Sequence, residues 1–347
     1  MTDEVLGRVF YHLCERGPLP LRHLLFVSRR FYSVAVNNAV LWTTISLDSS
    51  FFHHFYRWPE RRNRFVEHCL LRSGSLPLCL FINCSGLNAF DHTFLLHPLE
   101  ILGKPEWRAF QRCSSLLMWN TEDYTGTLTE FVNLLPKSLP SLKYISLSRF
   151  GDIVDDLQFP VCPVLERVEM FNQFIIPHFW GTNFLHVTTL CFGEAQSWMD
   201  SDLATFSLFP VLYDLTLFTR DTQPLEFIVD SRLPIIFEHL NILRVHGCIP
   251  SAILTKLVAP ALEELHIKAN AHNITSIYPL QTSFNPLCQY ILALLPEAVS
   301  TAEPEWAANL SKLVQNCTRI KSLYISRWME EECKKFMSGQ DVILHIQ

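Results

Sequence analysis

The sequence lacks any apolar run long enough to cross a membrane. Its most apolar window, residues 287–299, is interrupted by Pro296 and Glu297, whereas a membrane-spanning helix needs roughly 20 apolar residues. The first charged residues, Asp3 and Glu4, are acidic, whereas a secretory signal begins with a basic stretch. We therefore expect no export signal and no membrane partner, and we predict a cytoplasmic and/or nuclear protein.

The short motifs that mark many enzymes are also missing. There is no Gly-rich phosphate-binding loop, no H-E-x-x-H and no G-x-S-x-G. The 11 cysteines form no C-x-x-C pair, so we expect buried thiols in a reducing compartment rather than a zinc site. We predict no catalytic residue, no metal and no cofactor. A catalytic site assembled from residues far apart in the sequence would leave no such motif.

Charge is scarce and unevenly placed. Only 18% of the 347 residues are charged, and 49% are hydrophobic, which is a globular composition. Residues 1–72 hold 10 basic and 6 acidic side chains, whereas residues 73–347 hold 18 and 28. This division favours two parts with different partners, and the acidic main part argues against nucleic acid as a ligand. The length exceeds the roughly 250–300 residues of a single core, so we expect two domains or a repeat array.

The N-terminal residues predict a small helical module. Thr2 is suited to cap a first helix whose first turn carries Asp3 and Glu4. The spacing of apolar residues predicts helical segments over 5–13 and 21–35, a short piece at 40–42, and a strand over 43–47. About 45 residues of this kind bury little apolar surface by themselves. A partner or the rest of the chain must therefore complete the module.

This module resembles the F-box. The resemblance is carried, in the family's order and spacing, by Asp3–Leu13, Val27-Ser28-Arg29-Arg30-Phe31 and Leu41-Trp42. The sequence departs from the family at Ser28 and Phe31, where Cys and Trp are usual, and at Met1-Thr2, where Leu-Pro is usual. Further along, Trp58, a predicted helix over 61–71 and the run 72–78 look like the F-box proteins of mushroom-forming fungi.

The resemblance implies docking onto the Skp-type adaptor of a Skp–cullin–F-box ubiquitin ligase and, through it, onto a cullin. The residues predicted to form or support adaptor binding are Val5, Leu6, Val9, Phe10, Leu13, Leu24, Val27, Phe31, Leu41 and Trp42. The alternative is that these helices only cap a repeat array, because solenoids need terminal caps. The two roles are compatible.

The predicted helix after the module is rich in arginine. Its apolar residues, Phe65, Val66, Cys69 and Leu70, fit one face of a helix, which predicts that the arginines lie on another face. A solvated face is the favoured interpretation of these arginines over a phosphate-binding patch. They would also attract an acidic adaptor.

A repeated pattern occupies the rest of the chain. In seven segments an apolar residue is followed by apolar residues three and five positions later, and Pro precedes the first by two in four of them. The first apolar residues are Leu142, Leu165, Val187, Leu212, Leu240, Leu262 and Ile320. Their separations are 23, 22, 25, 28, 22 and 58, and leucine-rich repeats span about 20–29 residues. The 58-residue gap would hold two units or one unit with an insertion.

The last two apolar residues of each segment are two apart and so point to one face of a strand. Neighbouring units must stack to cover this face. Earlier strands are predicted over 76–83 and 114–119, and a closing strand over 342–346. Residues 286–299 and 304–316 show a helical pattern. The Asn of the leucine-rich-repeat consensus is matched at Asn172 and Asn270 but not in the other repeats. Both observations indicate that the repeats are irregular.

The other face of these strands is polar. Its residues predicted to bind a protein substrate are Tyr144, Arg167, Glu169, Asp214, Arg244, His246, Glu264, His266, Lys268 and Tyr324. Stacked strands would place them on one broad surface, which solenoids use for binding. An ordinary solvated sheet face remains the alternative interpretation.

Together these patterns predict an α/β protein in which an F-box-like helical module precedes an open leucine-rich-repeat-like solenoid with a parallel sheet. The predicted parts are the module at 1–47, a linking helix at 48–75 and the solenoid at 76–347. The predicted function is that of a non-catalytic substrate receptor of a ubiquitin ligase, with an unknown protein substrate. The alternative is an interaction scaffold whose F-box is degenerate.

Overall fold

The computed structural model describes the chain in segments. They are residues 2–14, 21–48, 59–83, 92–119, 132–148, 158–171, 183–193, 208–218, 235–246, 257–268, 317, 319–325 and 343–346. The chain forms two compact units, Met1–Leu165 with His178–Asn183, and Glu166–Pro177 with Phe184–Gln347. The predicted boundaries after residues 47 and 75 both lie inside the first unit.

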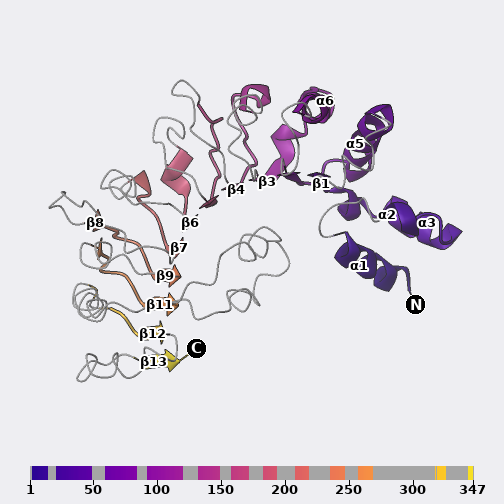
Figure 1. Ribbon diagram of the computed structural model, residues 1–347. Helices are drawn as coiled ribbons and strands as arrows, with labels where there is room; N and C mark the ends of the chain where they lie inside the picture. The colour runs from indigo at the N-terminus through magenta and orange to yellow at the C-terminus, as the bar shows by residue number, and fades with distance from the viewer. Residues whose placement is uncertain are drawn as a thin grey trace. The chain divides into compact units, whose positions relative to one another are not determined.

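The first unit begins with a cluster of short helices (Figure 1). Helix α1 spans Asp3–Leu13, α2 spans Leu21–Leu24, α3 spans Arg29–Asn37, and the 3-10 helix η1 spans Ala39–Trp42. The predicted cap is present, since the hydroxyl of Thr2 accepts from the backbone N–H of Val5 at 3.4 Å. The continuous helix predicted over 21–35 is wrong. The backbone of Ser28 is extended and its hydroxyl caps α3 by accepting from the N–H of Phe31 at 3.1 Å.

Helix α5, Pro59–Ser73, confirms the predicted linking helix. Val66, Cys69 and Leu70 are buried, as predicted, while Arg61 and Arg64 are exposed. Arg62 differs from the prediction, because it is buried with the apolar face. Arg62 lies four residues before Val66 and seven before Cys69, so the three residues share one side of the helix. Burial lowers the pKa of the Arg62 guanidinium. Helix α6, His92–Gly103, packs against α5.

Arg112, in the 3-10 helix η2 (Phe110–Arg112), holds the C-terminal end of α5. Its guanidinium donates to the carbonyls of Gly74, Leu70 and Leu76, the last two at 3.2 and 3.1 Å, and to the hydroxyl of Ser73 at 3.1 Å. The last carbonyls of a helix lack partners within the helix. A cation at this end therefore satisfies them and opposes the negative end of the helix dipole.

Four parallel strands follow in the first unit: β1 (Thr44–Leu47), β2 (Leu78–Asn83), β3 (Cys113–Trp119) and β4 (Tyr144–Ser148). They pair in the order of the chain, β1 with β2, β2 with β3 and β3 with β4. These strands confirm the sequence patterns at 43–47, 76–83 and 114–119. A parallel neighbour needs a crossover connection, and α5 supplies it between β1 and β2.

The second unit continues the same arrangement (Figure 1). Its parallel strands are β5 (Arg167–Phe171), β6 (Thr189–Gly193), β7 (Asp214–Phe218), β9 (Ile242–His246), β11 (Glu264–Lys268), β12 (Ser322–Ile325) and β13 (Ile343–Ile346). Each pairs with the next in this order. The short strands β8 (Ile235–Ile236) and β10 (Leu257–Val258) pair with each other in a separate ladder.

The 58-residue gap between Leu262 and Ile320 separates two strands that are direct neighbours. Glu264 of β11 pairs with Ser322 of β12, and Ile267 pairs with Ile325. The described strands β11 and β12 are therefore adjacent in the sheet, which argues against a further strand between them. The helical patterns at 286–299 and 304–316, and the residues Asn172 and Asn270, lie outside the described residues.

Each repeat carries the same local structure, which explains the sequence pattern. All 21 apolar positions of the seven segments are buried. The residue that begins each segment is buried too, and these are Leu139, Cys162, Phe184, Phe209, Phe237, Ala259 and Cys317. In six segments the N–H of the first apolar residue donates to the carbonyl of that starting residue, as Leu212 does to Phe209 at 3.2 Å. This is a β-turn, and the prolines stand at its second position, where their fixed φ is favourable.

The fold is thus α/β, with N-terminal helices followed by parallel strands in stacked turn-and-strand units, consistent with a leucine-rich-repeat-like solenoid. In the described part of the chain, no helix combines the length and apolarity that crossing a membrane requires.

Candidate binding surfaces

The predicted adaptor residues divide into a buried set and an exposed set. Leu6, Phe10, Leu41 and Trp42 are buried in the first unit, while Leu24 and Phe31 are partly exposed. Val5, Val9, Leu13 and Val27 are exposed. The buried set holds the module together, and only the exposed set is available to a partner without rearrangement.

Three contacts hold the module's helices in place. The ring of Phe10 on α1 meets Phe31 on α3 edge to face, with centroids 5.3 Å apart. The carboxylate of Asp3 accepts from the guanidinium of Arg30 at 2.7 Å across the same two helices. The indole N–H of Trp42 donates to the carbonyl of Ala35 at 2.9 Å in a buried site. A buried indole N–H needs such a partner, so the terminal Leu-Trp is structural in this fold.

Three members of the exposed set form a stripe on α1. Val5, Val9 and Leu13 are spaced four residues apart, so they lie on one side of the helix, beside the buried side that carries Leu6 and Phe10. Val27 precedes α3, and its neighbour Phe26 is the most exposed large apolar residue described, at 85%. Sequence reasoning missed Phe26. The sequence does mark it, because Phe26 is an apolar residue next to Val27 that lies outside the helical spacing of the apolar residues around it.

The second unit carries a polar strand face built from residues at matching positions of adjacent strands. One row runs Arg167, Thr189, Asp214, Ile242, Glu264, Ser322 and Ile343. The next row, two residues further along each strand, runs Glu169, Cys191, Thr216, Arg244, His266, Tyr324 and His345. Nine of the ten residues predicted for substrate binding belong to these two rows or to the next row, in which His246 pairs with Lys268.

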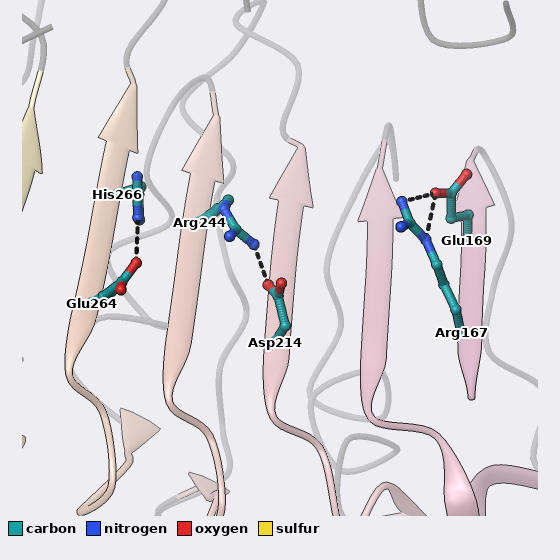
Figure 2. A network of polar contacts seen from close by, with 6 residues as sticks. All are labelled: Arg167, Glu169, Asp214, Arg244, Glu264 and His266. Carbon is teal, nitrogen blue, oxygen red and sulfur yellow. Dashed lines mark hydrogen bonds and ion pairs between the residues drawn. The ribbon is translucent and has the colours of Figure 1, made fainter. Parts of the chain in front are cut away.

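Acid–base pairs connect the first two rows, as Figure 2 shows. The guanidinium of Arg167 donates to the carboxylate of Glu169 at 2.6 and 3.1 Å. Arg244 on β9 pairs with Asp214 on the neighbouring β7. The imidazole of His266 lies 3.3 Å from the carboxylate of Glu264 on its own strand. These pairs hold the long side chains in one orientation.

Aromatic rings stack along the second row. The rings of His266 and Tyr324 have centroids 4.1 Å apart and planes 3° apart. The rings of Tyr324 and His345 follow at 4.3 Å and 11°. Adjacent strands lie about 4.8 Å apart, so in-register rings on neighbouring strands stack with little adjustment. His345 was not predicted, although it lies in the closing strand at the alternate position to the apolar residues.

Not every predicted substrate residue is accessible. The carboxylate of Glu169 is buried, with its side chain 2% exposed, so it orients Arg167 instead of presenting itself. Tyr144 belongs to the first unit, and the neighbouring face residue Ser146 is fully buried there. The accessible residues of the face in the second unit are Arg167 on β5 and, from β7 to β13, Asp214, Arg244, Glu264, His266 and Tyr324, all of them half-buried.

Burial shapes the ionisation of the face. Desolvation lowers the pKa of His266, the hydrogen bond with Glu264 raises it, and the charge of Arg244 lowers it again, with a net decrease below 6.5. Within the described segments, no three His, Cys, Asp or Glu side chains are grouped in a way that would hold a metal ion. The arrangement offers hydrogen-bond donors, paired charges and ring edges, which are the means of recognising another molecule.

No protein-family model matches the chain, and no curated protein matches it.

Proposed function

We propose that this protein is a substrate receptor of a Skp–cullin–F-box ubiquitin ligase, acting in the cytoplasm and/or nucleus. Its N-terminal helices dock onto the Skp-type adaptor, and its repeat units hold a protein substrate. The receptor forms no covalent bond itself. It contributes proximity, by bringing the substrate to the conjugating machinery.

The observation that carries the proposal is the apolar surface left on the helical module. Val5, Val9, Leu13, Phe26 and Val27 are all more than 40% exposed. All of them except Phe26 are residues that the F-box resemblance assigns to adaptor binding, on the first helix and just before the third. Burying such side chains in an interface contributes roughly 25 cal/mol per Å² of apolar area. Isolated exposed apolar residues are ordinary, but a stripe of them along one side of a helix is typical of an interaction site.

The test is a binding measurement between the full chain and the Skp-type adaptor of the same organism. We expect a complex with the unaltered chain. Leu13→Asp should weaken it by at least about 2 kcal/mol, because a charge would be buried in an apolar interface. Leu71→Asp on α5 is the matched control, since Leu71 is also exposed, at 66%, and lies outside the stripe. It should bind as the unaltered chain does.

Folding must be monitored in the same preparations, by circular dichroism and by thermal unfolding. Equal loss of binding in both variants, or no binding by a well-folded unaltered chain, would reject the ligase-receptor function. The protein would then be an interaction scaffold with a degenerate F-box, and its helices would serve as a cap.

A further inference from the structure

The half-buried face from β9 to β13 carries a continuous line of hydrogen-bond donors. In register order it runs from Arg244 through His266 and Tyr324 to His345. We propose that this line binds an acidic segment of a partner protein through the carboxylates of its Asp and Glu side chains. The inference deepens the proposed function, because it names the chemistry of the substrate that the second unit would hold.

The stacking geometry determines which part of each ring a ligand can meet. The ring of Tyr324 lies between His266 and His345, with plane angles of 3° and 11°. Its two faces are thus covered, and the edges of the stack carry the phenol hydroxyl and the imidazole nitrogens. Ring edges are electropositive, whereas ring faces attract cations. A stack of this kind therefore favours hydrogen-bond acceptors and anions over lysine or arginine side chains.

The acidic residues of the face are already engaged. Asp214 pairs with Arg244, and Glu264 lies 3.3 Å from His266. Each acid thus orients a donor of the line. Arg244 contributes a planar fork, which suits a carboxylate. Four donors on adjacent strands about 4.8 Å apart span about 14 Å, which is enough for several side chains of a bound segment.

Nucleic acid is the less suitable anion. Proteins that bind single strands stack the bases on open aromatic faces, and here Tyr324 has both faces covered by His266 and His345. Residues 73–347 also carry 18 basic against 28 acidic side chains, so a dense phosphate backbone would be repelled. A protein segment with only a few carboxylates is repelled less, because it carries fewer negative charges than the phosphate backbone.

Protonation of His266 should strengthen the interaction. The titratable groups that face His266 and His345 are Asp214 on β7, Arg244 and His246 on β9, Glu264 on β11 and Tyr324 on β12. Lys268 also belongs to β11. The imidazole of His266 gains positive charge as the pH falls below its lowered pKa, while the ligand's carboxylates stay ionised down to about pH 4.3. Binding of an acidic segment should therefore tighten on acidification.

The test uses the full chain and a fluorescein-labelled hexaglutamate peptide, with binding followed by fluorescence anisotropy at low salt. Hexalysine and hexaglutamine peptides of the same length serve as references, and so does a short single-stranded DNA. We expect hexaglutamate to bind most tightly, and more tightly at about pH 5.5 than at about pH 7.5. Tighter binding of hexalysine or DNA, or no binding of hexaglutamate beyond that of hexaglutamine, would overturn the proposal.

Substitutions locate the binding. Tyr324→Phe removes one hydroxyl and keeps the stacked ring, and it should weaken hexaglutamate binding roughly fivefold to tenfold. His266→Gln should remove most of the pH dependence as well. His239→Gln is the control, because His239 is an exposed histidine of the same unit in a turn, outside the strand face. If all three variants bind as the unaltered chain does, the donor line is not the site.

The result of the hexaglutamate measurement does not depend on the result of the adaptor measurement. Hexaglutamate binding to the face in a chain that ignores the adaptor would keep this inference and reject the ligase function. Adaptor binding without hexaglutamate binding would do the reverse.

Discussion

The rings of Phe171 and Phe218 meet across a strand to which neither belongs. Phe171 ends β5 and Phe218 ends β7, yet their centroids are 5.9 Å apart. Gly193 of β6 lies between them in register. A β-carbon on Gly193 would stand 2.8 Å from a ring carbon of Phe171 and 3.0 Å from Cβ of Phe218. The glycine is thus required by the packing of its two neighbours.

Gly193→Ala should destabilise the second unit by about 1–3 kcal/mol, because the added methyl group forces the two rings apart. The measurement is the free energy of unfolding in urea. Gly103→Ala is the control, since the nearest atom to its β-carbon would be 3.9 Å away, on Phe110. A Gly193→Ala chain as stable as the unaltered one would show that the rings separate at no cost.

Leu6 and Val9 on α1 should separate folding from docking. Leu6 is 1% exposed and Val9 is 44% exposed. Leu6→Ala should lower the free energy of unfolding by about 2–5 kcal/mol through loss of core packing. Val9→Ala should change it by less than about 0.5 kcal/mol while weakening adaptor binding. Equal destabilisation by the two variants would contradict the division into a buried and an exposed set.

Arg112→Met should destabilise the first unit by about 2–4 kcal/mol. The substitution leaves the carbonyls of Leu70 and Leu76 and the hydroxyl of Ser73 without their donor, and unmet buried acceptors are costly. Arg8→Met is the matched control, because the ion pair of Arg8 with Glu4 is exposed and contributes less than about 1 kcal/mol. Urea unfolding monitored by tryptophan fluorescence distinguishes the two. A similar small loss for both would show that water replaces the guanidinium.

Stability should fall at alkaline pH because buried thiols resist ionisation. Burial raises the pKa of Cys162 from 9.0 to about 12. The folded state therefore holds a proton that the unfolded state releases above pH 9. The stabilising effect is complete below the unfolded pKa and is lost as the pH rises through the folded value.

Each such thiol should lower the free energy of unfolding by about 1.4 kcal/mol per pH unit within this range. Cys162→Ala should remove one such contribution, which is seen by comparing urea unfolding of the two chains between pH 9 and 12. Parallel pH profiles for the two chains would mean that Cys162 ionises normally in the fold.

The repeats were predictable from sequence because their periodicity is local. An apolar residue followed by others three and five positions later describes a turn and one strand face, and both are set within nine residues. The turn at Phe209 to Leu212 and the strand that follows it need no distant information. The strand over 43–47 and the helix over 61–71 were equally readable, because the spacing of their buried residues matches the period of each element.

Other features depended on neighbours that the pattern does not reveal. Ser28 interrupts what reads as one helix, because its hydroxyl caps α3 and its backbone is extended. Arg62 follows the apolar side of α5 into the interior, although its charge predicted a solvated position. Nothing local to either residue identifies which alternative prevails, since the outcome depends on what packs against it.

The sequence by itself determined the repeating turn and strand, the cap at Thr2, and the division between apolar and polar strand faces. These follow from spacing and side-chain chemistry within a few residues. Only the tertiary structure decided that Leu6 is buried while Val9 is exposed, that β11 and β12 are neighbours across a 58-residue gap, and that His266, Tyr324 and His345 stack. These relationships join residues far apart in the chain. They depend on register and on competition for the same interior space, which no local pattern records.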